Sequence, residues 1–479
     1  MIIDTLGGYN VTPEITHFSG RLRRLNIDDV HNPDDLRFNE ASVLYLEGNT
    51  TIIPQILKAQ RPNVSGVLFA EGGGFFHPAL CLSAEGVPCA VKPKQDITPL
   101  EGKQVTVDLS SGQILTDDDA KKFSPKHKSQ IIVDSSIRTE AEVSAYVRSM
   151  RELKYLEGIA QQGVKPKYIV LSLEPTFYET YEDPYKLVHT DPGKLTRILK
   201  PYIIKAAEIP EAMAYVRTPE ITGPERGVNE SHTSGIAELR GAPYDVHKDQ
   251  AFFTYLFRLI EDIRKERPDI AEKIGVVIAM PRSSDDMTES IRIMEQNTSL
   301  RAGQNINVTG FLENPYWFMP SSTQSPDVRR LTNEPIKEES LKDKGKNVFW
   351  GTGDLNSCMM AASREIPQMK AYLAHRADFM ESMRKSIHEW SKLWFRFHLA
   401  GGPVWRPYKT DEENIQLYDI LLRNGAGVAV KPEQLLDVRR IVNEMERRRN
   451  MLRGPPREDI ERLTPPTGNN AKRSLQKNS

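Results

Sequence analysis

EGGGFFHP, residues 71–78, is a glycine run that ends at a single histidine, His77. A short apolar run precedes it at 65–70 and small and apolar residues follow it at 81–84, which predicts a strand, a glycine turn and a helix start. Glycines permit positive φ and leave backbone N–H groups open to an anion, which a helix N-terminus also attracts. A histidine placed there suits a nucleophile towards phosphorus. The alternative is a tight turn with a packed histidine.

Length and composition bound the class of protein. At 479 residues the chain has room for two or three domains. A formal net charge of −1 indicates neither a nucleic-acid partner nor an acidic tail. The three cysteines, Cys81, Cys89 and Cys358, are too few and scattered for a disulfide framework or a zinc site, and favour a reducing cytoplasm. No signal segment opens the chain and no apolar run approaches about 18 residues, so neither secretion nor a membrane span is expected.

Beyond residue 130, short apolar runs alternate with stretches of helical period. Strands are predicted at 131–134, 168–173, 213–217, 276–280, 306–312, 347–350, 396–400 and 427–430. Helices are predicted at 140–156, 250–267, 367–394, 414–422 and 432–452. Eight strands that alternate with helices predict a (β/α)8 barrel.

The resulting organisation is α/β. It consists of an unassigned leader (1–17), a small mixed domain (18–116), a polar linker (117–129), the barrel (130–452) and a tail (453–479) that is poor in apolar residues and is expected to be disordered.

Charged residues follow five of the predicted barrel strands. In a barrel of this kind the catalytic groups lie at the carboxyl ends of the strands. The five residues are Glu174, Arg217, Arg282, Glu313 and Asp354. Together they predict a mouth with carboxylates for a hard cation, Mg²⁺ or Mn²⁺, and guanidinium groups for a phosphate or carboxylate. Solvated rim charges are the alternative for each residue taken alone.

Segments of the first domain resemble a known family. Residues 66–77, 86–91, 100–108 and 111–114 are similar in order and spacing to the swivelling phosphohistidine domain of phosphoenolpyruvate-utilising enzymes. This family includes phosphoenolpyruvate synthase, pyruvate phosphate dikinase and enzyme I of the sugar phosphotransferase system. The resemblance implies a small swivelling β/α domain in which His77 carries the phosphoryl group. Phe76 and Pro78 replace the residues that usually flank that histidine.

The second half resembles the barrel of the same family. The similar segments are 215–218, 238–241, 278–283, 310–315, 349–355 and 363–364. The resemblance implies that Arg217, Arg240 and Arg282 are catalytic and also bind substrate, and that Arg364 and Gly353 contact substrate. It further implies that Glu313 and Asp354 hold the metal ion, and that the protein forms a homodimer through the barrel.

Two features of the family are absent from the sequence. Members that form or consume phosphoenolpyruvate have a catalytic cysteine near the seventh strand, but residues 397–407 contain none, and Cys358 lies in a different motif. His398 is the titratable residue nearest that place and could replace the cysteine as the acid. The alternative is that His398 has a structural role. An ATP-grasp domain and a phosphate-binding P-loop are also missing, so ATP use is expected on a separate ATP-grasp subunit.

Three functions remain open. The first is a phosphotransferase-like enzyme that passes a phosphoryl group through His77 to or from a small substrate, which is pyruvate-like or phosphoenolpyruvate-like or an alcohol or enol acceptor. The second is a non-phosphorylating partner or regulatory subunit. The third is a self-contained enzyme that uses phosphoenolpyruvate. The missing cysteine disfavours the third, and the retained arginines and carboxylates disfavour the second. Trp317, Phe318 and Trp350 are expected either to pack the barrel or to line a site for a larger substrate.

Overall fold

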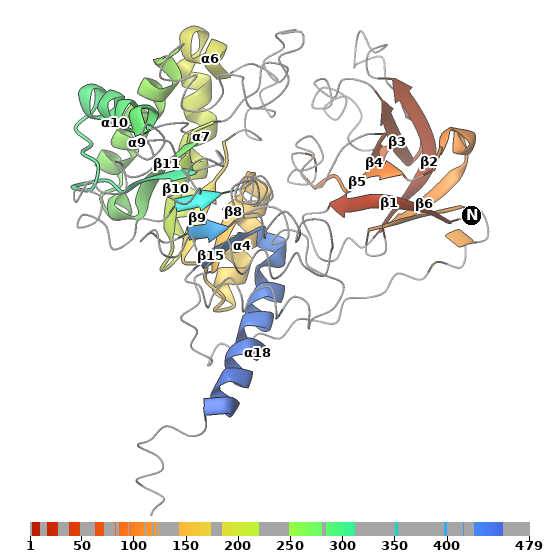
Figure 1. The fold of residues 1–479 in the computed structure, drawn as a ribbon. Coiled ribbons are helices and arrows are strands. Elements are labelled where there is room, and N and C mark those ends of the chain that lie inside the picture. Colours follow the sequence, from red (N-terminus) through yellow and green to blue (C-terminus); the bar gives the residue numbers. More distant parts are fainter. Residues whose placement is uncertain are drawn as a thin grey trace, which may run out of the picture.

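The protein is a mixed α/β molecule with two closed sheets, seen in a computed structural model (Figure 1). The structure describes residues 2–9, 17–26, 38–47, 63–70, 82, 86–93, 95–109, 112–116, 119–120, 123, 143–173, 184–219, 249–279, 284–311, 350–352, 397–399, 415 and 426–453.

The first sheet is a closed barrel of seven strands in the order β1-β5-β4-β3-β2-β6-β7. Its strands are β1 (Ile2–Tyr9), β2 (His17–Asn26), β3 (Ser42–Glu47), β4 (Val64–Phe69), β5 (Cys89–Pro93), β6 (Gln104–Asp108) and β7 (Gln113–Thr116), with a short 3-10 helix, η5 (Thr98–Leu100), before β6. The pairs from β2 through β3 and β4 to β5 are parallel, whereas β1, β6 and β7 pair in antiparallel fashion.

A ring that packs over a glycine shapes the interior of this first barrel. The Phe18 ring occupies the space where a side chain of Gly66 would lie, since a Cβ built on Gly66 would be 2.3 Å from it. Phe18 belongs to a buried cluster with Leu22, Val43 and Leu68. Gly66 is therefore required so that the ring of Phe18 on β2 can fill the barrel.

The sequence assigns no element to residues 1–17, yet Ile2–Tyr9 forms β1 and closes the first barrel. Its register pairs Gly7 with Val91 of β5 and Ile3 with Ile114 of β7. Asp4, Gly7 and Gly8 have low strand propensity and interrupt the apolar alternation, which explains why the strand was not predicted. The predicted range of 18–116 is thus too short at its N-terminal end.

The second sheet is a closed barrel of eight strands, all of whose pairs are parallel (Figure 1). Its strands are β8 (Val143–Val147), β9 (Tyr168–Leu171), β10 (Met213–Arg217), β11 (Ile274–Ala279), β12 (Val308–Phe311), β13 (Trp350–Thr352), β14 (Phe397–Leu399) and β15 (Ala426–Val430). The predicted arrangement of eight strands in a parallel barrel is therefore present.

Helices follow the barrel strands wherever the intervening chain is described. They are α4 (Met150–Gln161), α6 (Pro184–Thr190), α7 (Pro192–Glu208), α9 (Ala251–Glu266), α10 (Ser284–Asn297) and α18 (Leu435–Arg453), with the 3-10 helices η7 (Ala271–Lys273) and η10 (Pro432–Gln434). The apolar stripe of α9 is typical of them: Phe253, Phe257 and Ile260 are fully buried at a spacing of three or four residues. The predictions of 250–267 and 432–452 as helices are confirmed.

The first barrel strand was predicted at the wrong place. The prediction put a strand at 131–134, outside the described residues, and a helix at 140–156, but Val143–Val147 is β8 and the helix α4 begins only at Met150. Ser149 marks this start, because its side chain accepts a hydrogen bond from the Glu152 backbone N–H at 3.1 Å. The predicted helices at 367–394 and 414–422 lie outside the described residues, apart from Ile415.

Candidate functional site at the carboxyl ends of the barrel strands

The interior of the eight-stranded barrel contains a cluster drawn from strands alone. Its members are Tyr146, Tyr168, Val170, Tyr215, Val277 and Ala429, whereas the alternate strand residues pack with the helices in a separate core. Side chains alternate along a strand, so this division separates inward from outward positions. The Tyr168 and Tyr215 rings meet edge to face, with their centroids 5.7 Å apart. The barrel therefore has an aromatic, packed interior.

Three polar residues continue the inward set at the carboxyl ends of neighbouring strands. Arg148, Ser172 and Arg217 each come two residues after a member of the interior cluster, namely Tyr146, Val170 and Tyr215. They are 3%, 4% and 4% exposed. We call these three residues the mouth row.

The strand register places the members of the mouth row level with one another. Leu171 of β9 pairs with Val147 of β8 and with Val216 of β10, so the next residue on each strand belongs to the row. The ladder continues past the strand end, since the Ser172 backbone N–H donates to the Val147 carbonyl oxygen at 2.8 Å. Adjacent strands lie about 4.8 Å apart, so the Cα atoms of Arg148 and Arg217 are about 10 Å apart across Ser172.

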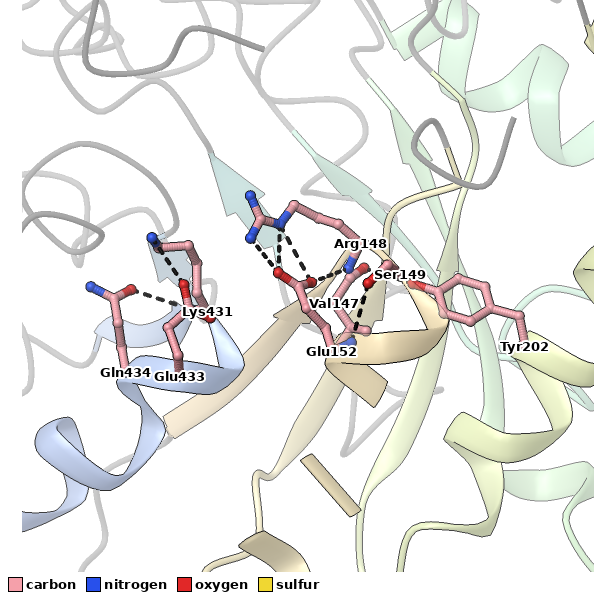
Figure 2. A network of polar contacts seen from close by, with 8 residues as sticks. All are labelled: Val147, Arg148, Ser149, Glu152, Tyr202, Lys431, Glu433 and Gln434. Atoms are coloured by element: carbon pink, nitrogen blue, oxygen red, sulfur yellow. Dashed lines mark hydrogen bonds and ion pairs between the residues drawn. The ribbon is translucent and has the colours of Figure 1, made fainter. Parts of the chain in front are cut away.

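The Arg148 side chain is held by Glu152, which lies in the first turn of α4 (Figure 2). Arg148 Nε donates to Glu152 Oε1 at 3.0 Å, Nη2 donates to the same oxygen, and the Arg148 backbone N–H donates to Oε2 at 2.6 Å. The Tyr202 hydroxyl of α7 fixes the preceding residue by donating to the Val147 carbonyl oxygen at 3.0 Å. These bonds hold the end of β8 and the guanidinium group in one place.

A second buried ion pair lies at the end of the neighbouring strand, β15 (Figure 2). Lys431 Nζ is 3.0 Å from Glu433 Oε1, and both residues are 7% exposed. Within the described part of the chain, neither carboxylate oxygen of Glu433 has a partner in good hydrogen-bond geometry. The contact is therefore an ion pair and not a strong directed hydrogen bond.

The two pairs act on one another electrostatically. Burial raises the pKa of the Glu152 carboxyl, Arg148 lowers it, and the carboxylate of Glu433 raises it further. Burial also raises the pKa of the Tyr215 hydroxyl, with Tyr168 adding to the effect, so this phenol stays neutral beneath the mouth row. At the carboxyl ends of β8 and β15, each buried cationic group thus lies beside a carboxylate, so the two pairs are close to neutral in sum.

Among the predicted site residues, Arg217 is the one described together with its side chain, while the backbones of Trp350 and His398 belong to β13 and β14. Arg217 ends β10 and is almost fully buried at the carboxyl end of the strand. Its neighbour Thr218 anchors the strand end to β11, since Thr218 Oγ1 accepts a hydrogen bond from the Ala279 backbone N–H at 2.8 Å. The remaining predicted site residues lie outside the described residues: His77, Glu174, Arg240, Arg282, Glu313, Gly353, Asp354 and Arg364.

The strands that precede the two predicted metal ligands are neighbours. β12 pairs with β13 in parallel, with Phe311 opposite Gly351. Glu313 and Asp354 come shortly after these positions in the sequence, so both loops begin side by side at the same end of the barrel. Among the described residues, no three histidine, cysteine, aspartate or glutamate side chains gather to hold a metal ion.

Sequence reasoning missed Arg148, Ser172 and Lys431. Each lies two residues beyond an inward residue of its own strand, namely Tyr146, Val170 and Ala429. Side chains two residues apart on a strand point to the same side, so this spacing was a usable signal. Arg148 was hidden by the incorrect helix at 140–156, and Lys431 falls between the predicted strand at 427–430 and the predicted helix at 432–452. Ser172 lay inside the predicted strand 168–173 without a charge to mark it.

A groove on the outside of the barrel is a weaker candidate. It has a volume of about 520 Å³ and lies among α6, α7 and α9. Lys200 and Glu266 pair across it, and the Tyr255 hydroxyl is 2.9 Å from Thr196 Oγ1. Its paired charged groups are partly exposed, whereas the side chains of the mouth row are almost fully buried.

Comparison with known proteins does not assign a family. No protein-family model matches the chain, and no curated protein matches it. One solved structure with similarity is that of PbGH5A, a glycoside hydrolase family 5 enzyme from Prevotella bryantii B14. It is 8% identical, with a TM-score of 0.32 over 62% of this chain and 86% of that chain, which carries no argument about function. In the described part of the chain, every helix is too short or too polar to cross a membrane.

Proposed function

We propose that the protein is a phosphotransferase-like enzyme that moves a phosphoryl group through His77 to or from a small substrate in the mouth of the eight-stranded barrel. The proposal depends on one observation: the guanidinium group of Arg217 is buried at the carboxyl end of β10, at a position that faces the barrel interior. A buried arginine at that end of a parallel barrel is suited to a phosphate or carboxylate. Its motif is one of those in which the sequence resembles the phosphoenolpyruvate-utilising family.

The arginines of the proposed site bind and orient the anionic group. Arg217, with Arg240, Arg282 and Arg364 from the loops, neutralises charge on the group being transferred, and the packed interior beneath keeps water away. Glu313 and Asp354 supply the hard oxygen ligands that Mg²⁺ or Mn²⁺ prefers. When bound, the metal ion draws charge from the substrate oxygens.

Partners follow from the same proposal. ATP is used by a separate ATP-grasp subunit, since no P-loop motif occurs in the printed sequence. Because the barrel lacks the expected cysteine at 397–407, the substrate is one that needs no deprotonation at carbon, such as an alcohol or an enol. A homodimer through the barrel and a cytoplasmic location complete the proposal.

Phosphohistidine formation tests this function. We expect the full chain, incubated with Mg²⁺ and phosphoenolpyruvate carrying ³²P, to gain an acid-labile, base-stable label. In this half-reaction the bond between phosphorus and the enol oxygen breaks, a bond from phosphorus to a His77 ring nitrogen forms, and pyruvate leaves as its enolate. No acid at carbon is needed for this step, so the missing cysteine does not prevent it. His77→Ala abolishes the label. Arg217→Gln lowers it, whereas the control Arg264→Gln does not, because Arg264 lies at the opposite end of the barrel against the Ile274 and Asn305 carbonyl oxygens. A label that survives His77→Ala, or a wild type that takes none, contradicts the proposal.

A further inference from the structure

We propose that Glu433 is the general base that takes the hydroxyl proton of the phosphoryl acceptor, and that this acceptor is a small hydroxy acid. The inference rests on the proposed function, because it names the group that completes the transfer from His77. The arginines of the proposed site stay protonated, so none of them takes a proton from an alcohol. Neither the charges at the strand ends nor the family resemblance indicates Glu433.

Two buried carboxylates lie near each other at the ends of β8 and β15, and their hydrogen bonding differs (Figure 2). Both oxygens of Glu152 accept hydrogen bonds from Arg148, Oε1 from Nε at 3.0 Å and Oε2 from the backbone N–H at 2.6 Å. Among the described residues, neither oxygen of Glu433 accepts a hydrogen bond, although both are buried. Glu152 is therefore fully used within the protein, whereas the lone pairs of Glu433 are left for a ligand.

The burial of Glu433 makes its lack of hydrogen bonds costly. Glu433 is 7% exposed, so it has lost most of its water, and Lys431 Nζ at 3.0 Å supplies a counter-charge without the geometry of a hydrogen bond. Buried polar groups with no hydrogen bond are few in folded proteins, and a catalytic role is one reason for them. A base whose oxygens were bound to protein donors would have to break those bonds before it took a proton, and Glu433 has none to break.

The position of Glu433 places it at the barrel mouth. Lys431 comes two residues after Ala429, an inward member of the interior cluster, and Glu433 follows in η10. Between β15 and β10, the strand of Arg217, lie β8 and β9. Three strand spacings of about 4.8 Å amount to about 14 Å along the wall, so Arg217 and Glu433 lie on nearly opposite sides of an eight-stranded barrel. A ligand that reaches both has an anionic group at one end and a hydroxyl at the other, which is the chemistry of a hydroxy acid.

The step itself is transfer of the phosphoryl group to the hydroxyl oxygen. The O–H bond of the acceptor breaks, and its proton moves to a Glu433 oxygen. The electron pair left on the hydroxyl oxygen forms the new bond to phosphorus, while the bond between phosphorus and the His77 ring nitrogen breaks and leaves its pair on that nitrogen. Lys431 is a positioning residue, because its ammonium group holds the Glu433 side chain at the end of β15.

Separate measurement of the two half-reactions tests this assignment. The full chain is labelled on His77 with Mg²⁺ and phosphoenolpyruvate carrying ³²P, freed of donor by gel filtration, and mixed with glycolate, lactate or glycerate. Labelling removes no alcohol proton, so Glu433→Gln should take the label as fast as wild type. Transfer of the label to the hydroxy acid should be about 100-fold slower in Glu433→Gln, which is the lower end of what a general base contributes. Glu433→Asp retains a carboxylate and should be slowed less.

A second variant guards against loss of folding. Glu433→Gln leaves the Lys431 ammonium group buried without a counter-charge, which destabilises a fold. The double variant with Lys431→Gln and Glu433→Gln removes both charges and should show the same slow transfer. The matched control is Glu157→Gln, whose partly exposed pair with Lys205 joins two outer helices, and it should transfer at the wild-type rate. Uptake of the label shows that each variant is folded.

The outcomes separate the base from the function. Wild-type transfer in Glu433→Gln and in the double variant, with normal labelling, overturns the base and leaves the proposed function standing. A wild type that takes the label but passes it to none of the three hydroxy acids also overturns the inference, because the acceptor class is then wrong. Equal slowing of labelling and transfer in both variants shows a structural role and overturns the base. A wild type that takes no label on His77 overturns the proposed function, and the base with it.

Discussion

The Tyr215 ring lies against Gly275 inside the eight-stranded barrel and shapes the floor beneath Arg217. A Cβ on Gly275 would be 2.6 Å from Tyr215 Cε1 and 3.0 Å from the Asn307 carbonyl oxygen. Neither neighbour can move easily, because the ring is fully buried and the oxygen is backbone. Because Gly275 on β11 has no side chain, the Tyr215 ring can take this position beneath Arg217.

Gly275→Ala should destabilise the protein by about 1–3 kcal/mol, because the added methyl group overpacks the interior. The control is Gly158→Ala in α4, where a Cβ meets nothing within 4 Å and should stabilise the helix by about 0.5–1 kcal/mol. Urea unfolding followed by circular dichroism measures both changes. A Gly275→Ala variant at least as stable as wild type contradicts the description of the floor.

Glu152→Gln should cost about 3–5 kcal/mol of folding stability, because it leaves the Arg148 guanidinium buried without a counter-charge. The control on the same helix is Glu157→Gln. Glu157 pairs with Lys205, and both side chains are partly exposed. Loss of this ion pair should therefore change the free energy of unfolding by less than about 1 kcal/mol. The same unfolding experiment compares them. Equal effects for the two variants show that the Arg148 pair is no more important than a surface pair.

At the scale of elements, the boundary between β8 and α4 shows how a sequence pattern can mislead. Val143, Tyr146, Val147 and Met150 recur at spacings of three and four, which is the signature of an amphipathic helix. Every residue of Val143–Val147 is nevertheless buried, because a strand in a parallel barrel is covered on both faces. The usable local signal was Ser149 with Glu152 three residues later, which marks a helix start.

Removal of residues 1–10 should open the first barrel, because β1 bonds to both β5 and β7. We expect the backbone amides at Val91 and Ile114, the partner positions of β1, to lose protection from hydrogen exchange. Amides of β9 in the second barrel, such as that of Ile169, serve as the internal control and should be unchanged. Full protection at Val91 in the shortened chain contradicts the closure of the barrel by β1.

Across the whole molecule, the sequence predicted those features that depend on short apolar runs. The parallel strands β9 to β15 overlap their predicted ranges, and Arg217 was placed correctly at the end of β10. The closure of the first barrel by β1, and the level at which the members of the mouth row meet, were not predictable in this way. Both depend on which strands become neighbours and in what register, and a single sequence does not contain that information directly.

We propose that the carboxyl ends of the barrel strands bind a metal ion together with an anionic substrate. Electron paramagnetic resonance titration of Mn²⁺, with and without phosphoenolpyruvate, is the test of this proposal. We predict a Mn²⁺ site that the Glu313→Ala and Asp354→Ala double variant loses and that the surface control, Glu157→Ala with Asp269→Ala, keeps. Phosphoenolpyruvate should tighten Mn²⁺ binding in wild type but not in Arg217→Gln, because both ligands must share one site to be coupled. Equal Mn²⁺ affinity in wild type and the Glu313→Ala and Asp354→Ala variant would contradict the account.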